Sequence, residues 1–328
     1  MKNLGRIVNN VSVFLFFVFL LPAGQAHAGP KITLSVCKEG CDFQTIRRAL
    51  ESVKGQNETI LLKDKIHTES NIRVDKNVTI TGYDRETTIV QAHAQPETAQ
   101  ARVFWIAEKA AVTLANLTIR NGHVPNGPDG GGGVENRGRL LILNCRITQN
   151  IATHGAGVWN NGQLTMLNTQ IIQNRTVSPP AAEIKDATGC LGAGAGIKNE
   201  KGGFLSITDC LIEHNVSVNK GGGVFLSCES EAMISHTTIQ NNEAAQDGGG
   251  VHIRGELTLN ACRITQNRTL RKGGGIYNLG KLHFTNNWIT DNLNGGDCVL
   301  GEGGGIWGKG IIGVRQNNTI GDDQCTSP

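Results

Sequence analysis

One short phrase recurs seven times between Gly131 and Trp307: three small residues, then Val or Ile, then a variable residue. Successive copies begin 24, 39, 27, 27, 25 and 30 residues apart. The copies begin at Gly131, Gly155, Gly194, Gly221, Gly248, Gly273 and Gly303. A period in this range is typical of a solenoid, in which each repeat stacks on its neighbours. The repeat therefore predicts columns of equivalent residues, and function has to be sought along those columns.

A second consensus, Leu-x-Leu-x-x-Cys/Thr-x-Ile-x-x-Asn, lies between the glycine phrases. Its copies begin at Leu140, Leu164, Leu205, Ala232, Leu257 and Leu282 and end at Asn150, Asn174, Asn215, Asn242, Asn267 and Asn292. Alternation at period two predicts half-buried strands. The alternation slips by one residue before the Cys/Thr position, which predicts a bend there, at Asn144 and Asn168 in two copies. We expect three short strands and three corners in each repeat, with a structural role for the Asn column.

This pattern resembles the right-handed parallel β-helix superfamily that includes pectate lyases and polygalacturonases. The glycine phrase followed by Ile-Thr-Gln-Asn is also similar to the repeats of chlamydial polymorphic outer-membrane proteins. The resemblance covers residues 42 to about 320 and implies an all-β, single-stranded right-handed parallel β-helix solenoid. The alternative with the same period is a leucine-rich repeat, which we disfavour because glycine costs about 1 kcal/mol per residue in a helix.

Four segments are expected: a signal peptide at 1–28, an N-terminal cap with a helix at 29–56, the β-helix at 57–320 and a C-terminal tail at 321–328. The capping helix follows Cys41, and Asp42 is its expected N-cap. Its apolar face contains Phe43, Ile46, Leu50 and Val53. Such a helix would cover the open end of the solenoid.

The first 28 residues have a charged start, an apolar run and an Ala-x-Ala cleavage site of a bacterial kind. We expect a secreted, periplasmic or cell-surface monomer after cleavage at about Ala28. Cleavage removes Lys2 and Arg6, which leaves 29 Lys+Arg against 28 Asp+Glu. That balance excludes a basic field for nucleic acid. No later apolar stretch of about 18 residues predicts membrane insertion.

All nine cysteines follow the signal peptide. Cys145, Cys210 and Cys262 share one repeat position. The closest two lie two coils apart, or about 9.6 Å at about 4.8 Å per coil, beyond the limit of about 7 Å for a disulfide. We expect buried free thiols there and no metal site. The pairs expected among the other six, with the connectivity left open, are Cys37–Cys41, Cys190–Cys228 and Cys298–Cys325.

The residue after each Val or Ile of the glycine phrase is expected to point outward. These residues are Glu135, Trp159, Lys198, Phe225, His252, Tyr277 and Trp307. A glycine precedes the Val or Ile in every copy, so we expect a smooth strip edged by flat rings. Insertions at 122–130, 178–193 and 293–302 would wall it. Aligned exposed aromatic residues indicate a binding surface, here for a polysaccharide or other glycan along the axis. The alternative is a stacked ladder that only stabilises the sheet.

An enzyme is the second hypothesis, either a polysaccharide lyase or a glycoside hydrolase. The candidate catalytic residues are Asp247, His252, Arg254 and Lys220, and His154 is a further candidate. The resemblance to polygalacturonases would require Asp clusters where this chain has glycine. No cofactor is expected, and Ca²⁺ would be needed only by a lyase. The third hypothesis is an adhesin-like surface protein.

Overall fold

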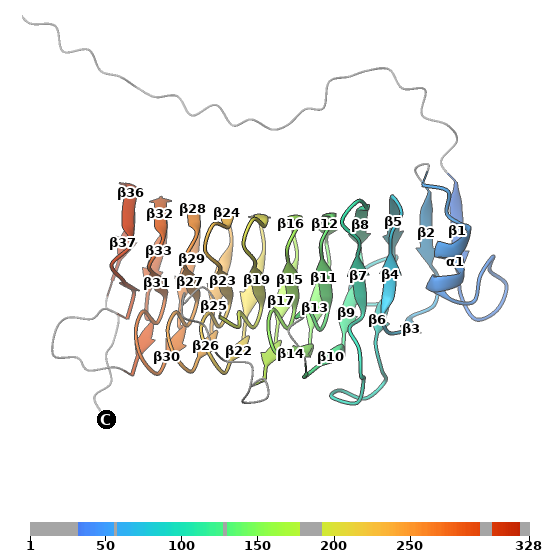
Figure 1. Ribbon diagram of the computed structural model, residues 1–328, viewed down its shortest axis with the longest axis horizontal. Coiled ribbons are helices and arrows are strands. Elements are labelled where there is room, and N and C mark those ends of the chain that lie inside the picture. Colours follow the sequence, from blue (N-terminus) through green and yellow to red (C-terminus); the bar gives the residue numbers. More distant parts are fainter. Residues whose placement is uncertain (1–31, 56–57, 127–129, 178–191, 296–303, 322–328) are drawn as a thin grey trace, which may run out of the picture. The chain divides into compact units, whose positions relative to one another are not determined.

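The computed structural model describes residues 32–55, 58–126, 130–177, 192–295 and 304–321. Over these residues the chain winds into stacked coils, and four parallel sheets run along the stack (Figure 1). We name them sheets A to D. Each strand pairs with the equivalent strands of the coils before and after it, so the expected all-β parallel solenoid is confirmed.

In the described part of the chain, sheet A contains β1 (Thr33–Val36), β2 (Thr59–Leu62), β5 (Val78–Thr81), β8 (Ala111–Ala115), β12 (Arg139–Leu143), β16 (Gln163–Leu167), β20 (Phe204–Thr208), β24 (Glu231–Ser235), β28 (Glu256–Asn260), β32 (Lys281–Thr285) and β36 (Ile311–Gln316). Sheet B contains β3 (Ile66–Thr68), β6 (Ile89–Gln91), β9 (Thr118–Arg120), β13 (Arg146–Thr148), β17 (Gln170–Ile172), β21 (Leu211–Glu213), β25 (Thr238–Gln240), β29 (Arg263–Thr265), β33 (Trp288–Thr290) and β37 (Thr319–Ile320). Sheet C contains β4 (Ile72–Val74), β7 (Phe104–Ile106), β11 (Val134–Asn136), β15 (Val158–Asn160), β19 (Ile197–Asn199), β23 (Val224–Leu226), β27 (Val251–Ile253), β31 (Ile276–Asn278) and β35 (Ile306–Trp307). Sheet D contains β10 (His123–Val124), β14 (Ile151–Ala152), β18 (Arg175–Thr176), β22 (Val216–Ser217), β26 (Glu243–Ala244), β30 (Arg268–Thr269) and β34 (Leu293–Asn294).

A coil of the central stack thus contributes a strand to each of four sheets, and the expectation of three strands was wrong. In one coil the strands are β11, β12, β13 and β14, from sheets C, A, B and D in that order. Sheet D follows the Asn position, and its strands are two residues long. A two-residue strand is too short to show alternation, so its pattern could not be recognised.

Inward side chains stack in columns to form the core. On sheet A the register pairs Leu140 with Leu164, and Leu164 with Leu205, all buried. The corner after this sheet bends at Asn144 and Asn168, whose φ angles are 54° and 44°. Asn adopts this left-handed conformation more readily than most residues. The expected bend is therefore confirmed.

The Asn column is a hydrogen-bonded ladder, as expected. Asn215 donates from its backbone N and its Nδ2 to Asn242 Oδ1, at 3.0 and 2.9 Å. Its own Oδ1 accepts the same two bonds from Asn174, both at 3.0 Å. The pattern extends along the stack through Asn150, Asn174, Asn215, Asn242, Asn267 and Asn292. The ladder satisfies backbone groups at a buried corner, where unpaired groups are costly.

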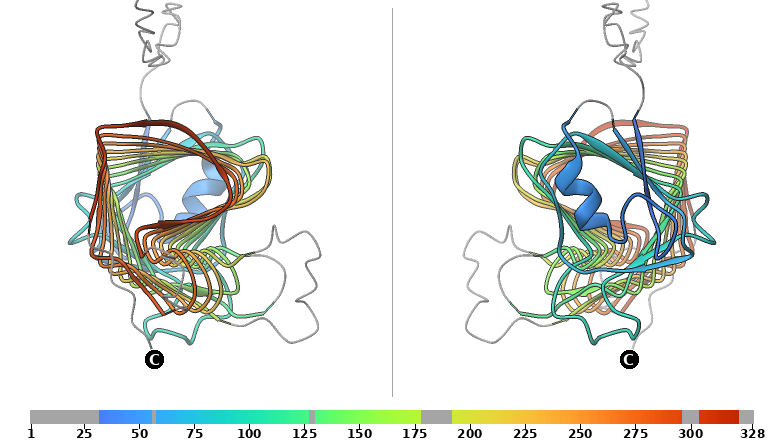
Figure 2. Two further views of the ribbon diagram at one scale, coloured as in Figure 1. Left: turned by 90° about the vertical axis from the view of Figure 1, so that its left-hand side faces the viewer. Right: turned by 90° about the vertical axis from the view of Figure 1, so that its right-hand side faces the viewer.

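Helix α1 (Ile46–Ser52) lies across the opening of the coils at the N-terminal end (Figure 2). Its buried face includes Ile46, Ala49 and Leu50. The N-cap is Thr45, whose side chain accepts the Arg48 N–H, so the expected cap at Asp42 was wrong.

Asp42 lies three residues before the N-cap and forms hydrogen bonds with Ser35. Its carboxylate accepts from the backbone N and the hydroxyl of Ser35, at 2.8 and 2.7 Å. The backbone bond, followed by the hydroxyl bond, lowers the pKa of Asp42. Asp42 therefore joins the chain before the helix to β1.

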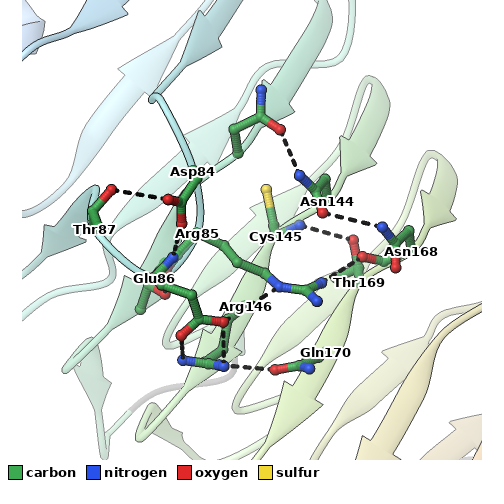
Figure 3. Close-up of polar contacts among 12 residues, drawn as sticks. Asp84, Arg85, Glu86, Thr87, Asn144, Cys145, Arg146, Asn168, Thr169 and Gln170 are labelled. Carbon is green, nitrogen blue, oxygen red and sulfur yellow. Dashed lines mark hydrogen bonds and ion pairs between the residues drawn. The ribbon is translucent and has the colours of Figure 1, made fainter.

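The turn between β5 and β6 reaches along the stack and fastens three later coils (Figure 3). The Arg85 carbonyl accepts from Thr118 Oγ1 at 2.6 Å, and the Arg85 guanidinium donates to the Asn168 carbonyl at 2.9 Å. Glu86 receives two 2.7 Å bonds from Arg146, in the fork geometry favourable to Arg–carboxylate pairs. This turn ties residues 83 positions apart, which no repeat pattern predicts.

The predicted Cys37–Cys41 disulfide and the three predicted buried free thiols are confirmed. Cys37 and Cys41 form a disulfide, and Cys145, Cys210 and Cys262 are buried free thiols. Burial raises the pKa of Cys145 to about 12 and those of Cys210 and Cys262 to about 11. These thiols are therefore protonated fillers of the core.

Cys228 is also disulfide-bonded. The predicted partner Cys190 lies outside the described residues, so this pairing stays a prediction. The predicted Cys298–Cys325 pair lies wholly outside them.

Replacing Asn215 by Ala should lower the free energy of unfolding by about 2–4 kcal/mol. The change removes the hydrogen-bond partner of at least two buried groups. They are the Asn174 N–H and the Ile171 carbonyl, which accepts from Asn215 Nδ2 at 2.8 Å. Each unsatisfied group costs about 1–3 kcal/mol. Urea denaturation measures the difference. Asn161→Ala, at an exposed corner residue, is the control and should change stability by less than about 0.5 kcal/mol. Equal stability of the Asn215 variant and the unaltered chain would show that the ladder is not stabilising.

Candidate functional site

The seven residues predicted to form a column do stack as vertical neighbours in sheet C. The register joins Glu135 to Trp159, Trp159 to Lys198 and so on to Trp307. The same column continues toward the N-terminus through Trp105 and Arg73. We call this set of nine residues the outward column, because it lies on the side of sheet C away from the apolar core.

The C-terminal part of the outward column is a stack of rings. Ring centroids are 4.9 Å apart for Phe225 and His252, 4.8 Å for His252 and Tyr277, and 5.0 Å for Tyr277 and Trp307. The ring planes deviate by 16–18°. This spacing follows the coil separation of about 4.8 Å. The alternative of a stacked ladder describes this part of the column.

The N-terminal part holds ion pairs. Glu135 contacts Arg102 at 2.7 Å and Arg137 at 2.5 Å, and accepts a bond from Trp105 Nε1 at 2.9 Å. Lys198 lies 2.5 Å from Glu200. Glu135 and Lys198 are almost fully buried, so these pairs neutralise charges that burial would otherwise make costly.

Burial contradicts the expected exposed strip. Phe225 and His252 are 0 % exposed and Trp159 is 7 % exposed, while Tyr277 and Trp307 are half-buried. Neighbouring rings cover one another, and the corner before sheet C covers their edges. A Cβ built on Gly192, for example, would lie 2.0 Å from a Phe225 ring atom. Alternation places these side chains on the correct side of the strand, but it cannot show what covers that side.

The glycine column is not a surface strip either. A Cβ built on Gly196 would lie 2.5 Å from the Gly223 carbonyl oxygen and 3.2 Å from the Asn215 side chain. A Cβ built on any of five further glycines would also contact the carbonyl oxygen of the next coil and an Asn side chain of the ladder. These glycines are Gly133, Gly157, Gly223, Gly250 and Gly275. Glycine is required because successive corners and the Asn ladder pack against each other. The insertions expected to wall the strip lie partly or wholly outside the described residues.

Two of the catalytic candidates, Asp247 and His252, are shielded, whereas Arg254 and Lys220 are half-buried. Burial raises the pKa of Asp247, against the charges of Arg271 and Lys220. His252 is fully buried, and among the described residues neither of its ring nitrogens has a hydrogen-bond partner. Residues this buried cannot touch a substrate, so the arrangement does not favour catalysis by Asp247 and His252.

The structure shows a groove that the sequence analysis missed, at the corner between sheets C and A. It has a volume of about 540 Å³ and is lined by residues 229–231, 254–256, 279–281 and 309–311. Each of the four coils contributes the same three corner positions. The sequence signal is the charged residues that flank Gly255, Gly280 and Gly310. That signal is short and resembles an ordinary turn.

The groove combines paired and unpaired charges. Glu256 contacts Lys281 at 2.9 Å and His283 at 3.4 Å. The hydrogen bond from Lys281 is the main cause that lowers the pKa of Glu256. Among the described residues, the Arg254 guanidinium has no hydrogen-bond or ion-pair partner, and its Nε is buried. A ligand in the groove would therefore not have to displace a described partner of Arg254.

No metal centre is present among the described residues: no three His, Cys, Asp or Glu side chains lie close enough to hold an ion. In the same part of the chain, no helix has the length and apolar character that a membrane span needs.

Comparison with known proteins defines the family. A family model described as "Right handed beta helix region" matches residues 100–218 and 183–322. The chain belongs to this family, and the resemblance to the β-helix superfamily is confirmed. No curated protein matches the sequence.

Solved structures similar to this chain include two pectin methylesterases. PemA from Erwinia chrysanthemi is 13% identical, with 84% of this chain and 80% of that chain covered and a TM-score of 0.38. The Aspergillus niger enzyme is 14% identical, with coverages of 88% and 86% and a TM-score of 0.38. ORF18 of Geobacillus virus E2 is 13% identical, with coverages of 90% and 60% and a TM-score of 0.41.

Replacing His252 by Phe should make stability less sensitive to acid. Burial, reinforced by the charges of Lys220 and Arg254 and opposed by the Asp247 backbone, lowers the pKa of His252 well below 6.5. Below about pH 6.5 the unfolded chain takes up a proton that the folded chain refuses. Stability is then lost by up to about 1.4 kcal/mol per pH unit. Thermal unfolding should show a smaller fall in Tm for the variant between about pH 7.5 and 5.

The control for this experiment is His214→Asn. The His214 side chain is 56% exposed, and its φ of 53° suits Asn. This variant should keep the acid sensitivity of the unaltered chain. An equal loss of Tm in the His252 variant and the unaltered chain would contradict a neutral, buried His252.

Proposed function

We propose that this protein binds a polysaccharide in the groove between sheets C and A, without cleaving it, outside the cytoplasm. The observation that carries the proposal is the repetition of one corner in four successive coils along the groove. At about 4.8 Å per coil these corners extend over about 14 Å. A ligand of repeating units would meet equivalent groups in each coil.

The lining suits a polyhydroxylated ligand. The Arg254 guanidinium, Lys309 and Glu231 supply donors and acceptors for hydroxyl groups. Leu279, half-buried at this corner, adds an apolar contact to the lining. Binding therefore moves from the expected strip to the neighbouring corner, still parallel to the axis.

Charge in the groove favours binding over catalysis. The lowered pKa of Glu256 keeps this carboxylate ionised at neutral pH, whereas a general acid needs a raised pKa. The location outside the cytoplasm is supported by the signal sequence and by the disulfide between Cys37 and Cys41.

The double variant Arg254→Gln/Lys309→Ala tests this proposal. Affinity electrophoresis against a panel of neutral and acidic polysaccharides should show retention of the unaltered protein by at least one of them. The double variant should bind that polysaccharide at least about tenfold more weakly, equivalent to about 1.4 kcal/mol. Lys309 is exposed and the buried Arg254 Nε has no partner to lose among the described residues, so the Tm should change little.

Arg263→Gln is the matched control. Arg263 lies in the same coil as Arg254, exposed on sheet B, and its loss should leave retention unchanged. The proposal fails if no polysaccharide retains the protein, or if the double variant is retained as strongly as the unaltered chain. Release of reducing ends or unsaturated products would show that the protein is an enzyme instead.

A further inference from the structure

The last strand of sheet A departs from the regular pairing of the earlier strands. From β8 to β32, neighbouring strands pair five residues in unbroken register. Between β32 and β36 the register shifts: Ile312 lies opposite Leu282, and Arg315 lies opposite Phe284. The last strand therefore spans one residue more than its partner over this interval, which is a β-bulge.

The bulge is held by specific contacts. Gly313 lies against the ring of His283, where a Cβ would come within 2.1 Å of Cε1. His283 Nδ1 accepts the backbone N–H of Val314 at 3.0 Å. The additional residue is thus accommodated by a glycine and fixed by a hydrogen bond, and the neighbouring strand supplies the acceptor.

The bulge places a charged residue in a column that is otherwise apolar. The column of sheet A that ends at Arg315 runs through Ile80, Leu114, Ile142, Met166, Ile207, Ile234, Leu259 and Phe284, all buried. The guanidinium carbon of Arg315 lies 5.8 Å from the centroid of the Phe284 ring. A cation at this distance covers the ring face and keeps its charge in water. The apolar column therefore ends at a charge.

An edge of this kind needs protection. Ile311, Ile312 and Val314 are 67%, 46% and 43% exposed, and a regular strand with such side chains would readily pair with another strand. Bulges and inward-pointing charges are the features by which natural sheets prevent edge pairing. Two copies related by a twofold axis would bring their last strands together antiparallel, because the same edge is presented twice.

We propose that the bulge and Arg315 together prevent this edge of the solenoid from pairing with the same edge of a second copy. The bulge interrupts the row of backbone donors and acceptors along β36. Arg315 would place two like charges close together at the contact and would lose water on pairing.

Deleting Gly313 together with Arg315→Leu tests the proposal. The deletion restores the five-residue spacing of the earlier strands, and the substitution restores an apolar residue in the inward column. Light scattering coupled to gel filtration should show a monomer for the unaltered chain and a concentration-dependent dimer for the double variant. Small-angle X-ray scattering should show a maximum dimension close to twice that of the monomer, as expected for an end-to-end contact.

The control is Arg263→Leu, which adds an exposed leucine on the lateral face of sheet B and should stay monomeric. Should the deletion prevent folding, Arg315→Leu alone removes the charge from an exposed side chain and should form a weaker dimer. The proposal is overturned if all folded variants remain monomeric, if the control dimerises equally, or if the unaltered chain is already an end-to-end dimer.

Discussion

The register between successive coils at the corner before sheet C is the constraint on which the rest of the structure depends. There the glycine column passes the Asn ladder so closely that a Cβ at Gly196 would lie 2.5 Å from the next coil. Each Asn side chain in turn binds the backbone and side chain of its neighbour. Close packing and hydrogen bonding thus fix the same vertical alignment. Because of this alignment, equivalent residues in all four sheets lie directly above one another.

Vertical alignment explains both the outward column and the groove. Rings at equivalent positions are held about one strand spacing apart, so they stack face to face and bury one another. A charged side chain buried in the same column requires a partner of opposite charge. Glu135 pairs with Arg102 and Arg137, and Lys198 pairs with Glu200. At the next corner the chain turns through glycines, and the side chains on either side remain accessible. The same repeat therefore creates a closed column and, beside it, an open groove.

The ends of the stack need separate solutions, because repetition alone would leave strand edges unpaired. At one end α1 covers the core with Ile46, Ala49 and Leu50. At the other end a bulge and Arg315 interrupt the repeat. Between them, the turn that contains Arg85 and Glu86 joins coils that are distant in sequence. These three features depart from the repeat.

The sequence by itself determined the parallel solenoid, the Asn ladder, the bends at Asn144 and Asn168, the free thiols and the vertical order of the outward column. Each follows from periodicity, because equivalent positions in a repeat must stack. Only the tertiary structure decided that His252 is buried and that Arg254 has no partner in the described part of the chain. Only the tertiary structure also showed sheet D, whose strands have two residues each, and the N-cap at Thr45 in place of Asp42. Exposure depends on what another segment lays over a side chain, and alternation along one strand records only the side to which that residue points.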